Sequence, residues 1–200
     1  VNEYTHLLSD HSAGAVSLAV NDTSSFSIGD ELMVIQMQNA TGGESGLYEF
    51  AYVSSTNSTH LELTEPLNHS YRSGSFDTAT GASASQVLRV PHYTDVTVES
   101  GGSIVAKDWD GYSGGIVMFR ASGTVDVQGT ISASGRGYRG GPGQTSYDAD
   151  GYAGESTSGK YFLDTANEAN ALGGGAGGTA GGGVDTEWGG GGTGGGYGTP

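Results

Sequence analysis

The sequence predicts an all-β protein. A small N-terminal β-barrel or sandwich is followed by a β-solenoid-like unit, or by a second β-sandwich, and then by a glycine-rich tail. Three observations predict this fold class. Stretches with alternating apolar side chains fill residues 1–75, still shorter β-prone stretches separated by glycine begin at residue 86, and glycine dominates residues 171–200. We therefore expect domains at 1–75, 86–170 and 171–200.

Strand patterns dominate the N-terminal unit. Residues 16–20 and 48–53 alternate larger apolar side chains with small or polar ones, which is typical of strands with one buried face. Residues 32–37 (LMVIQM) are mostly apolar on both faces, as in a buried central strand, and a short strand at 61–63 precedes Pro66. Gly, Asn, Ser and Asp lie between these segments, and this turn chemistry favours a small barrel or sandwich that folds by itself.

The pattern changes after a small, polar stretch at about 76–86 (FDTATGASASQ), which we interpret as a linker. The β-prone segments that follow are short, and most are separated by glycine. They lie at 86–90, 96–99, 103–106, 116–120, 124–127 and 130–133. Strands of this length and spacing predict the rungs of a β-solenoid, in which each rung stacks on the preceding one.

The tail is the least ordinary segment. The chain has 38 glycines in 200 residues, and many of them follow Leu172. Ordering glycine costs more backbone entropy than ordering any other residue, so such a run is either a spacer or a set of closely packed backbones. Polyglycine II helices are one packed form. Flexible linkers mix glycine with serine, and the run at 173–198 has no serine, so we expect the tail to be ordered.

Charge and composition limit the classes of function. The formal net charge is -15, with 7 Lys and Arg against 22 Asp and Glu, and there is no cysteine. So few cations argue against nucleic acid as a partner. No apolar run approaches the roughly 20 residues of a membrane span. The chain begins at Val1 rather than Met, and we interpret this as a processed N-terminus or a cut chain.

A more specific pattern covers most of the chain from about residue 14. It consists of the segments 26–38 (FSIGDELMVIQMQ), 48–51 (YEFA), 61–67 (LELTEPL), 86–91 (QVLRVP), 109–123 (WDGYSGGIVMFRASG) and 129–135 (GTISASG), followed by glycine runs. This order resembles modules of large, secreted, glycine-rich surface proteins of bacteria and archaea. The resemblance implies an adhesin-like or filamentous protein at the cell surface, and it transfers no catalytic residue.

Four Asn-X-Ser/Thr sequences lie at predicted turns or strand ends of the N-terminal unit. Their acceptor residues are Asn21, Asn39, Asn57 and Asn68. In a secreted protein such sequences predict N-linked glycans. The alternative is a set of ordinary polar turns.

Two segments share the pattern D-x-D-G-Y-x-G. One contains Asp108 and Asp110, and the other contains Asp148 and Asp150. Alternating carboxylates in a glycine-containing loop supply the oxygen ligands that Ca²⁺ prefers, so we predict a calcium site at these four residues. The alternative is a pair of solvated turns in which each Asp bonds its own backbone.

Catalysis has little support in the sequence, and we expect no enzyme. The paired carboxylates are also the residue types of glycoside hydrolases, but the i, i+2 spacing sets no suitable separation. The five histidines lack metal-binding spacing, so we expect them at the surface or in turns. The glycine-rich half contains eight tyrosines and tryptophans that are able to stack on sugars or to pack as a satellite core. They are Trp109, Tyr112, Tyr138, Tyr147, Tyr152, Tyr161, Trp188 and Tyr197.

These observations favour a structural subunit of an extracellular filament, sheath or adhesive layer. Exposed strand edges and glycine-rich segments would join copies into a homo-polymer or homo-oligomer through main-chain contacts. One alternative is a carbohydrate-binding adhesin or a phage-type receptor-binding protein whose partner is a surface glycan. A third is a carbohydrate-active enzyme built on a β-helix.

Overall fold

The structure is a computed structural model of the chain, and it describes residues 1–41, 43–77, 81–139, 155–157 and 159. Two compact units are present. The first comprises Val1–Gln36, Leu47–Ser73 and Ala84–Gly137, and the second includes the described residues of Met37–Gly46, Gly74–Ser83 and the chain from Tyr138 onward. The described residues contain strands and no helix, so the predicted all-β class is confirmed.

Seven strands form the larger sheet. They are β1 (Tyr4–His6), β2 (Ser17–Ala19), β3 (Glu31–Gln38), β4 (Tyr48–Thr56), β5 (His60–Leu63), β6 (Gly74–Asp77) and β7 (Gly81–Val90). Six of them follow the order β1-β7-β3-β4-β5-β2, and β6 pairs with β7. The pairs β1–β7, β3–β4, β4–β5 and β2–β5 are antiparallel.

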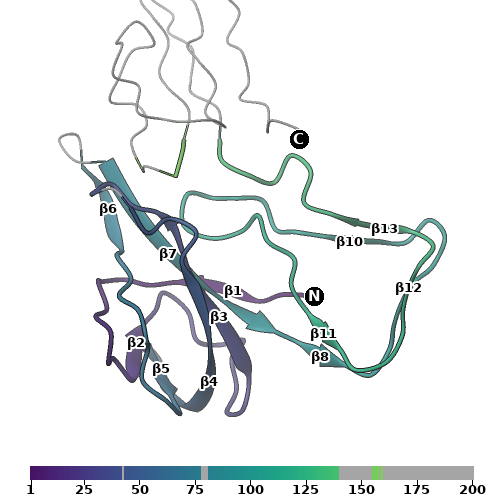
Figure 1. Cartoon of the computed structure of the whole chain (residues 1–200), viewed down its shortest axis with the longest axis horizontal. Coiled ribbons are helices and arrows are strands. Elements are labelled where there is room, and N and C mark those ends of the chain that lie inside the picture. Colours follow the sequence, from purple (N-terminus) through teal and green to yellow (C-terminus); the bar gives the residue numbers. More distant parts are fainter. Residues whose placement is uncertain (42, 78–80, 140–154, 158, 160–200) are drawn as a thin grey trace, which may run out of the picture. The chain divides into compact units, whose positions relative to one another are not determined.

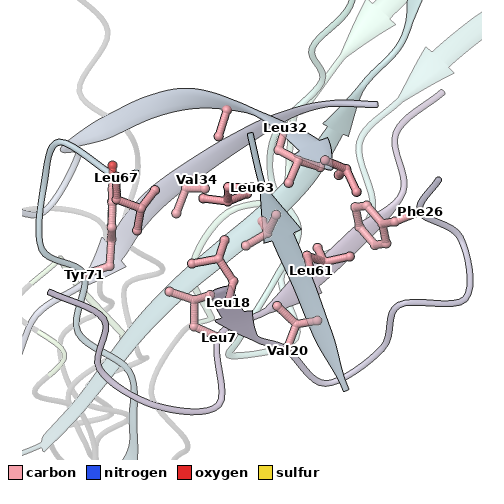
Figure 2. Packing of buried hydrophobic residues seen from close by; sticks show 13 residues of the cluster. Leu7, Leu18, Val20, Phe26, Leu32, Val34, Leu61, Leu63, Leu67 and Tyr71 are labelled. Carbon is pink, nitrogen blue, oxygen red and sulfur yellow. The ribbon is translucent and has the colours of Figure 1, made fainter. Parts of the chain in front are cut away.

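The sheet curls because its two ends meet. β1 and β2 lie at opposite ends of the strand order, yet Leu7 and Val20, which directly follow them, form an antiparallel bridge. A curled sheet encloses one face, and that face is apolar. Figure 2 shows the side chains that point into it, which form a single buried cluster. Leu18, Leu32 and Leu61 within it have no exposed surface, so the predicted N-terminal barrel-like unit is confirmed.

Residues 81–86 of the predicted linker belong to a strand. Residues 81–90 form β7, which lies between β1 and β3 in the sheet. Its alternation is one of small residues, and Ala82 and Ala84 are both buried. Alanine, serine and glycine have low β propensity, so the pattern resembled a loop although the positions are those of a buried strand.

The segment from His92 to Ser132 forms two stacked turns. The first turn contains β8 (His92–Tyr93), β9 (Val96–Val98) and β10 (Ser103–Val105), and the second contains β11 (Arg120–Ala121), β12 (Val125–Val127) and β13 (Thr130–Ser132). β8 pairs with β11, β9 with β12 and β10 with β13, all parallel and in register (Figure 1). Paired residues are about 28 positions apart, within the range of solenoid repeats. The predicted solenoid-like stacking is therefore present.

Two glycines permit this stacking. A Cβ at Gly129 would collide with the backbone carbonyl oxygens of Glu99 and Gly102, and one at Gly123 would collide with Thr94 and Asp95. Both glycines lie between strands of the second turn, where the backbone passes close to the first turn. Close backbone approach is a recurrent reason for glycine in strands.

The segment that leads to β11 covers part of the outer face of the curled sheet. Ile116 and Met118 pack on a second buried cluster made by Met33, Leu88 and Val90. The N-terminus reinforces this contact, because the Asn2 side chain both donates to and accepts from the backbone of Met118 and donates to the carbonyl of Arg89. The outer face of β4 receives no such cover from these side chains.

Candidate functional site

A row of three aromatic side chains runs along β4 on the face opposite the core. Tyr48, Phe50 and Tyr52 are 52%, 36% and 47% exposed, whereas Ala51 and Val53 between and beyond them are buried. The two-residue period of a strand places all three rings on one face. We call Tyr48, Phe50 and Tyr52 the aromatic row. Large rings in such numbers on one exposed strand mark a candidate binding surface.

The neighbouring strand and β11 fix the middle of the aromatic row. In the register of β3 with β4, Glu31 lies opposite Tyr52 and Met33 lies opposite Phe50. The Arg120 guanidinium lies over the Phe50 ring at 4.6 Å from its centre. The ring of Tyr48 meets that of Phe50 edge to face, with centroids 5.8 Å apart. Cation–π and edge-to-face contacts of this kind restrict ring orientation.

An ion cluster adjoins the aromatic row. Arg120 donates to both carboxylate oxygens of Glu31, from Nε to Oε2 at 2.6 Å and from Nη2 to Oε1 at 2.7 Å. His92 Nε2 lies 2.6 Å from Oε2. The Glu31 side chain is only 3% exposed, whereas those of Arg120 and His92 are about half exposed. The cluster therefore joins a buried carboxylate of β3 to polar groups of β8 and β11 that reach solvent.

Hydrogen bonding keeps Glu31 ionised. The bond from Arg120 is the largest influence, and it lowers the pKa of the Glu31 carboxyl below its ordinary value, against the opposing effect of burial. The bond from His92 acts in the same direction. In return, Glu31 raises the pKa of Arg120. Glu31 is therefore a fixed anion whose charge is balanced within the cluster.

A cleft of about 500 Å³ opens beside the aromatic row and the ion cluster. Its lining combines one ring of the row with charged and polar groups and with the start of the first solenoid turn. The lining residues are Gly29, Asp30, Glu31, Tyr52, Arg89, Val90, Pro91, His92 and Tyr93. The volume is within the usual range for small-molecule sites. Aromatic faces next to hydrogen-bonding groups suit ligands that are apolar on one side and hydroxylated on the other.

Comparisons with known proteins give only distant structural similarity. No known protein family and no curated protein match the sequence. Among solved structures, the chain is similar to the Gp54 tailspike of Acinetobacter baumannii bacteriophage AP22, solved in complex with A. baumannii capsular saccharide. The TM-score is 0.35 at 17% identity, over 64% of this chain and 22% of the tailspike.

Two tailspikes of Pseudomonas phages show similarity at the same level. For gp61 of phage phi297 the TM-score is 0.34 at 12% identity, over 66% of this chain and 20% of the tailspike. For gp49 of phage LKA1 the TM-score is 0.34 at 18% identity, over 74% of this chain and 24% of the tailspike. The chain thus spans less than a quarter of each tailspike. A likeness this low says nothing about activity, and the site is interpreted from its own residues. No helix in the described part of the chain is long and apolar enough to cross a membrane.

The predicted calcium ligands do not converge in the described residues. Asp108 is exposed and pairs with Arg136. Asp110 pairs with Lys107 at 2.6 Å and accepts the backbone N–H groups of Tyr112 and Ser113. This is the Asp turn that the sequence offered as the alternative, and no acidic or histidine cluster suited to a metal is found among the described residues. Asp148 and Asp150 lie outside the described residues, and calcium binding stays a prediction.

The four predicted glycosylation sites differ in accessibility. Asn21, Asn57 and Asn68 are exposed. Asn39 is 1% exposed, and its side-chain amide donates to the carbonyl of Gly43. A glycan at Asn39 would require this loop to open. Glycosylation at any of the four positions stays a prediction.

The sequence interpretation placed functional aromatics elsewhere. Of the eight in the glycine-rich half, Trp109 is buried, Tyr112 stacks on His6, and Tyr138 donates to the carbonyl of Met37. The other five, Tyr147, Tyr152, Tyr161, Trp188 and Tyr197, lie outside the described residues. The aromatic row itself was visible as the alternation of Tyr48, Phe50 and Tyr52. The ion cluster was not, because its members are far apart in the sequence.

Proposed function

We propose that this chain is a saccharide-binding part of an extracellular surface protein. The aromatic row and the adjoining cleft would form its binding face. The observation that carries the proposal is that three successive outward positions of β4 are aromatic and remain one-third to one-half exposed. Membership in the secreted, adhesin-like surface proteins that the sequence resembles is part of the same proposal.

The chemistry of sugars matches this surface. A pyranose ring presents C–H groups on its faces and hydroxyl groups around its edge. The C–H face stacks on exposed tyrosine or phenylalanine rings, and the hydroxyls need donors and acceptors nearby. Asp30, His92 and the hydroxyl groups of Tyr52 and Tyr93 supply such groups at the cleft. The Glu31–Arg120 pair holds this arrangement in place, which reduces the ordering that binding would otherwise require.

Self-association is a second candidate, and a separate observation favours it. Val125 and Val127 of β12 are each 45% exposed, and Ile131 of β13 is 37% exposed. Within the described residues, the strands of the second turn pair only with those of the first. Such an apolar edge suits main-chain pairing between copies, as in the filament, sheath or adhesive layer predicted from the sequence. Light scattering tests this by measuring oligomeric state. The protein should form oligomers, and the Val127→Lys variant should form fewer of them.

Binding without cleavage is the third element of the proposal. Glu31 is the buried carboxylate that lines the cleft, and it already receives hydrogen bonds from Arg120 and His92. A carboxylate held ionised in this way is unsuited to donate a proton to a leaving group. We therefore expect saccharides bound here to be recovered unchanged, and a reducing-sugar assay would reveal any turnover.

A glycan array followed by calorimetric titration tests saccharide binding. The protein should bind at least one surface-type glycan, and Tyr48→Ala and Tyr52→Ala should each weaken binding by about tenfold, the value of one lost ring contact. Tyr112→Ala is the matched control, because Tyr112 is similarly exposed but stacks on His6. Absence of binding to every glycan, or equal losses in all three variants, would contradict the proposal.

A further inference from the structure

We propose that the cleft takes an acidic saccharide and that Arg89 binds its carboxylate. This inference rests on the proposed function, which concerns saccharides in general, and adds the class of sugar. Arg89 is the penultimate residue of β7 and lines the cleft together with Asp30, Tyr52 and His92.

Among the lysines and arginines of the described residues, only Arg89 has no acidic partner there. The others are all paired: Arg72 with Asp10, Lys107 with Asp110, Arg120 with Glu31, Arg136 with Asp108 and Arg139 with Glu155. In a chain of net charge -15, acidic side chains are abundant. An arginine that lines a cleft and has no acidic partner among the described residues is available to a ligand.

The hydrogen bonding of Arg89 supports the same conclusion. Its Nε atom is buried and has no hydrogen-bond partner within the described part of the chain. Its backbone is satisfied, since the N–H donates to the carbonyl of Glu3 and the carbonyl accepts from Asn2. An unmet buried donor on a charged group is costly. Among the described residues, the protein therefore supplies no acceptor for the Nε–H of this cleft-lining arginine.

The chemistry of a guanidinium selects the ligand group. Arginine presents a planar fork of N–H donors that matches a carboxylate in a bidentate arrangement. Neutral sugar hydroxyls offer no such charge. A uronic acid combines a carboxylate with a ring face, so its carboxylate would meet Arg89 while its ring stacks on Tyr52 or the rest of the aromatic row.

The acidic groups at the cleft decide where the carboxylate is able to bind. Glu31 is paired with Arg120 and lies within hydrogen-bond distance of His92. Asp30 accepts the Ser27 N–H at Oδ2, but none of the described residues is its cationic partner. Asp30 would therefore repel an acidic ligand. Its conversion to Asn should therefore increase the preference for the acidic form of a sugar over the neutral form of the same sugar.

The test compares acidic oligosaccharides with their neutral counterparts on the full chain. Oligosaccharides of polygalacturonate, hyaluronan and alginate are each titrated beside the same material after reduction of its carboxyl groups. We expect the acidic form of at least one to bind about tenfold more tightly, the value of a charge-assisted bidentate contact. Arg89→Gln should abolish that difference while the neutral form still binds. Asp30→Asn should increase it about threefold, by removing one nearby like charge.

Arg72→Gln is the matched control, because it removes the same charge from an exposed arginine that pairs with Asp10. Melting curves establish that each variant is folded. If Arg89→Gln does not fold, the Arg89 Nε–H resonance of the unaltered protein gives the answer, since it should shift on addition of glucuronate and not of glucose. Equal binding of acidic and neutral forms, with ring variants still defective, would overturn this inference alone. Absence of binding to both forms would overturn the proposed function with it.

Discussion

The curled sheet and the two solenoid turns are stabilised by different interactions. The sheet encloses a cluster of leucines, valines and aromatics with almost no exposed surface, whose members come from positions as far apart as Leu7 and Val87. Among the described residues of the turns, only Val98, Ala106 and Trp109 are buried hydrophobics. Parallel backbone pairing and closely approaching glycines take their place. The packing of large side chains therefore stabilises the curled sheet. In parts of the solenoid turns, glycines without side chains let the backbones approach closely.

A core substitution in the sheet should have the largest effect. Leu61 is fully buried in the main cluster, so Leu61→Ala should lower the free energy of unfolding by about 3 kcal/mol through lost burial and a cavity. Ile131→Ala, in the second turn, removes a side chain that is already 37% exposed and should cost under about 1 kcal/mol. Denaturant unfolding measures both. Equal losses would contradict a difference in how the two regions are stabilised.

For glycine substitutions, the larger loss of stability should occur in the solenoid turns rather than in the sheet. Gly129→Ala places a Cβ against two carbonyl oxygens of the first turn, and we expect a loss of about 2 kcal/mol from overpacking. Gly74→Ala is the control, because its Cβ would meet nothing within 4 Å and its backbone is not left-handed. Thermal melting followed at β-type circular dichroism wavelengths compares the two. If Gly129→Ala is as stable as Gly74→Ala, the turns are not packed through their backbones.

Acid should weaken the attachment of the turns to the sheet at Glu31. Its pKa is lowered in the folded protein from the ordinary value of 4.5, chiefly by the hydrogen bond from Arg120. The stabilisation is therefore complete above that ordinary value and is lost as the pH falls through the folded-state pKa. Glu31→Gln should cost about 2 kcal/mol at neutral pH, as expected for charged hydrogen bonds. Unfolding measured against pH should show the two proteins converging in acid, and a constant difference would argue against the ion pair.

The Asp turn of the first solenoid turn should have a smaller effect. Asp110→Ala removes the acceptor for two backbone N–H groups and should cost about 1 kcal/mol. A plain Asp turn would give the same loss with and without millimolar calcium. A rise in melting temperature on adding calcium that disappears in the double variant Asp108→Ala, Asp110→Ala would instead establish the metal site predicted from the sequence.

Much of the fold follows from residue patterns. The predicted strands at 32–37, 48–53 and 61–63 lie within β3, β4 and β5, and those at 124–127 and 130–133 contain β12 and β13. The interpretation of 76–86 as a linker was wrong for residues 81–86, because β7 begins with small residues that carry no hydrophobic signal. Its position between β1 and β3 also means that a fragment ending at residue 75 lacks an interior strand, and we expect that fragment not to melt cooperatively. The division into domains at 75 and 86 stays a prediction.

The candidate site was less predictable than the fold. The alternation of aromatic residues in β4 is visible in the sequence. It does not show whether these side chains lie in the core or at the surface, because the sequence does not show which face of the strand is buried. Pairing of Glu31 with His92 and Arg120 depends on how the turns pack on the sheet, which no local pattern encodes. The unpaired state of Arg89 is a property of the whole neighbourhood. Sequence positions therefore supply candidates, and only tertiary structure distinguishes a ligand-facing side chain from a structural one.

Mapping a bound saccharide onto the chain tests the central claim most directly. Backbone and tyrosine-ring resonances are followed by NMR while a glycan selected on the array is added to the full-length protein. We predict that shifts will concentrate at the aromatic row of β4 and at residues 29–31 and 89–93 around the cleft. Shifts confined to the second solenoid turn, with Tyr48, Phe50 and Tyr52 unchanged, would contradict the account.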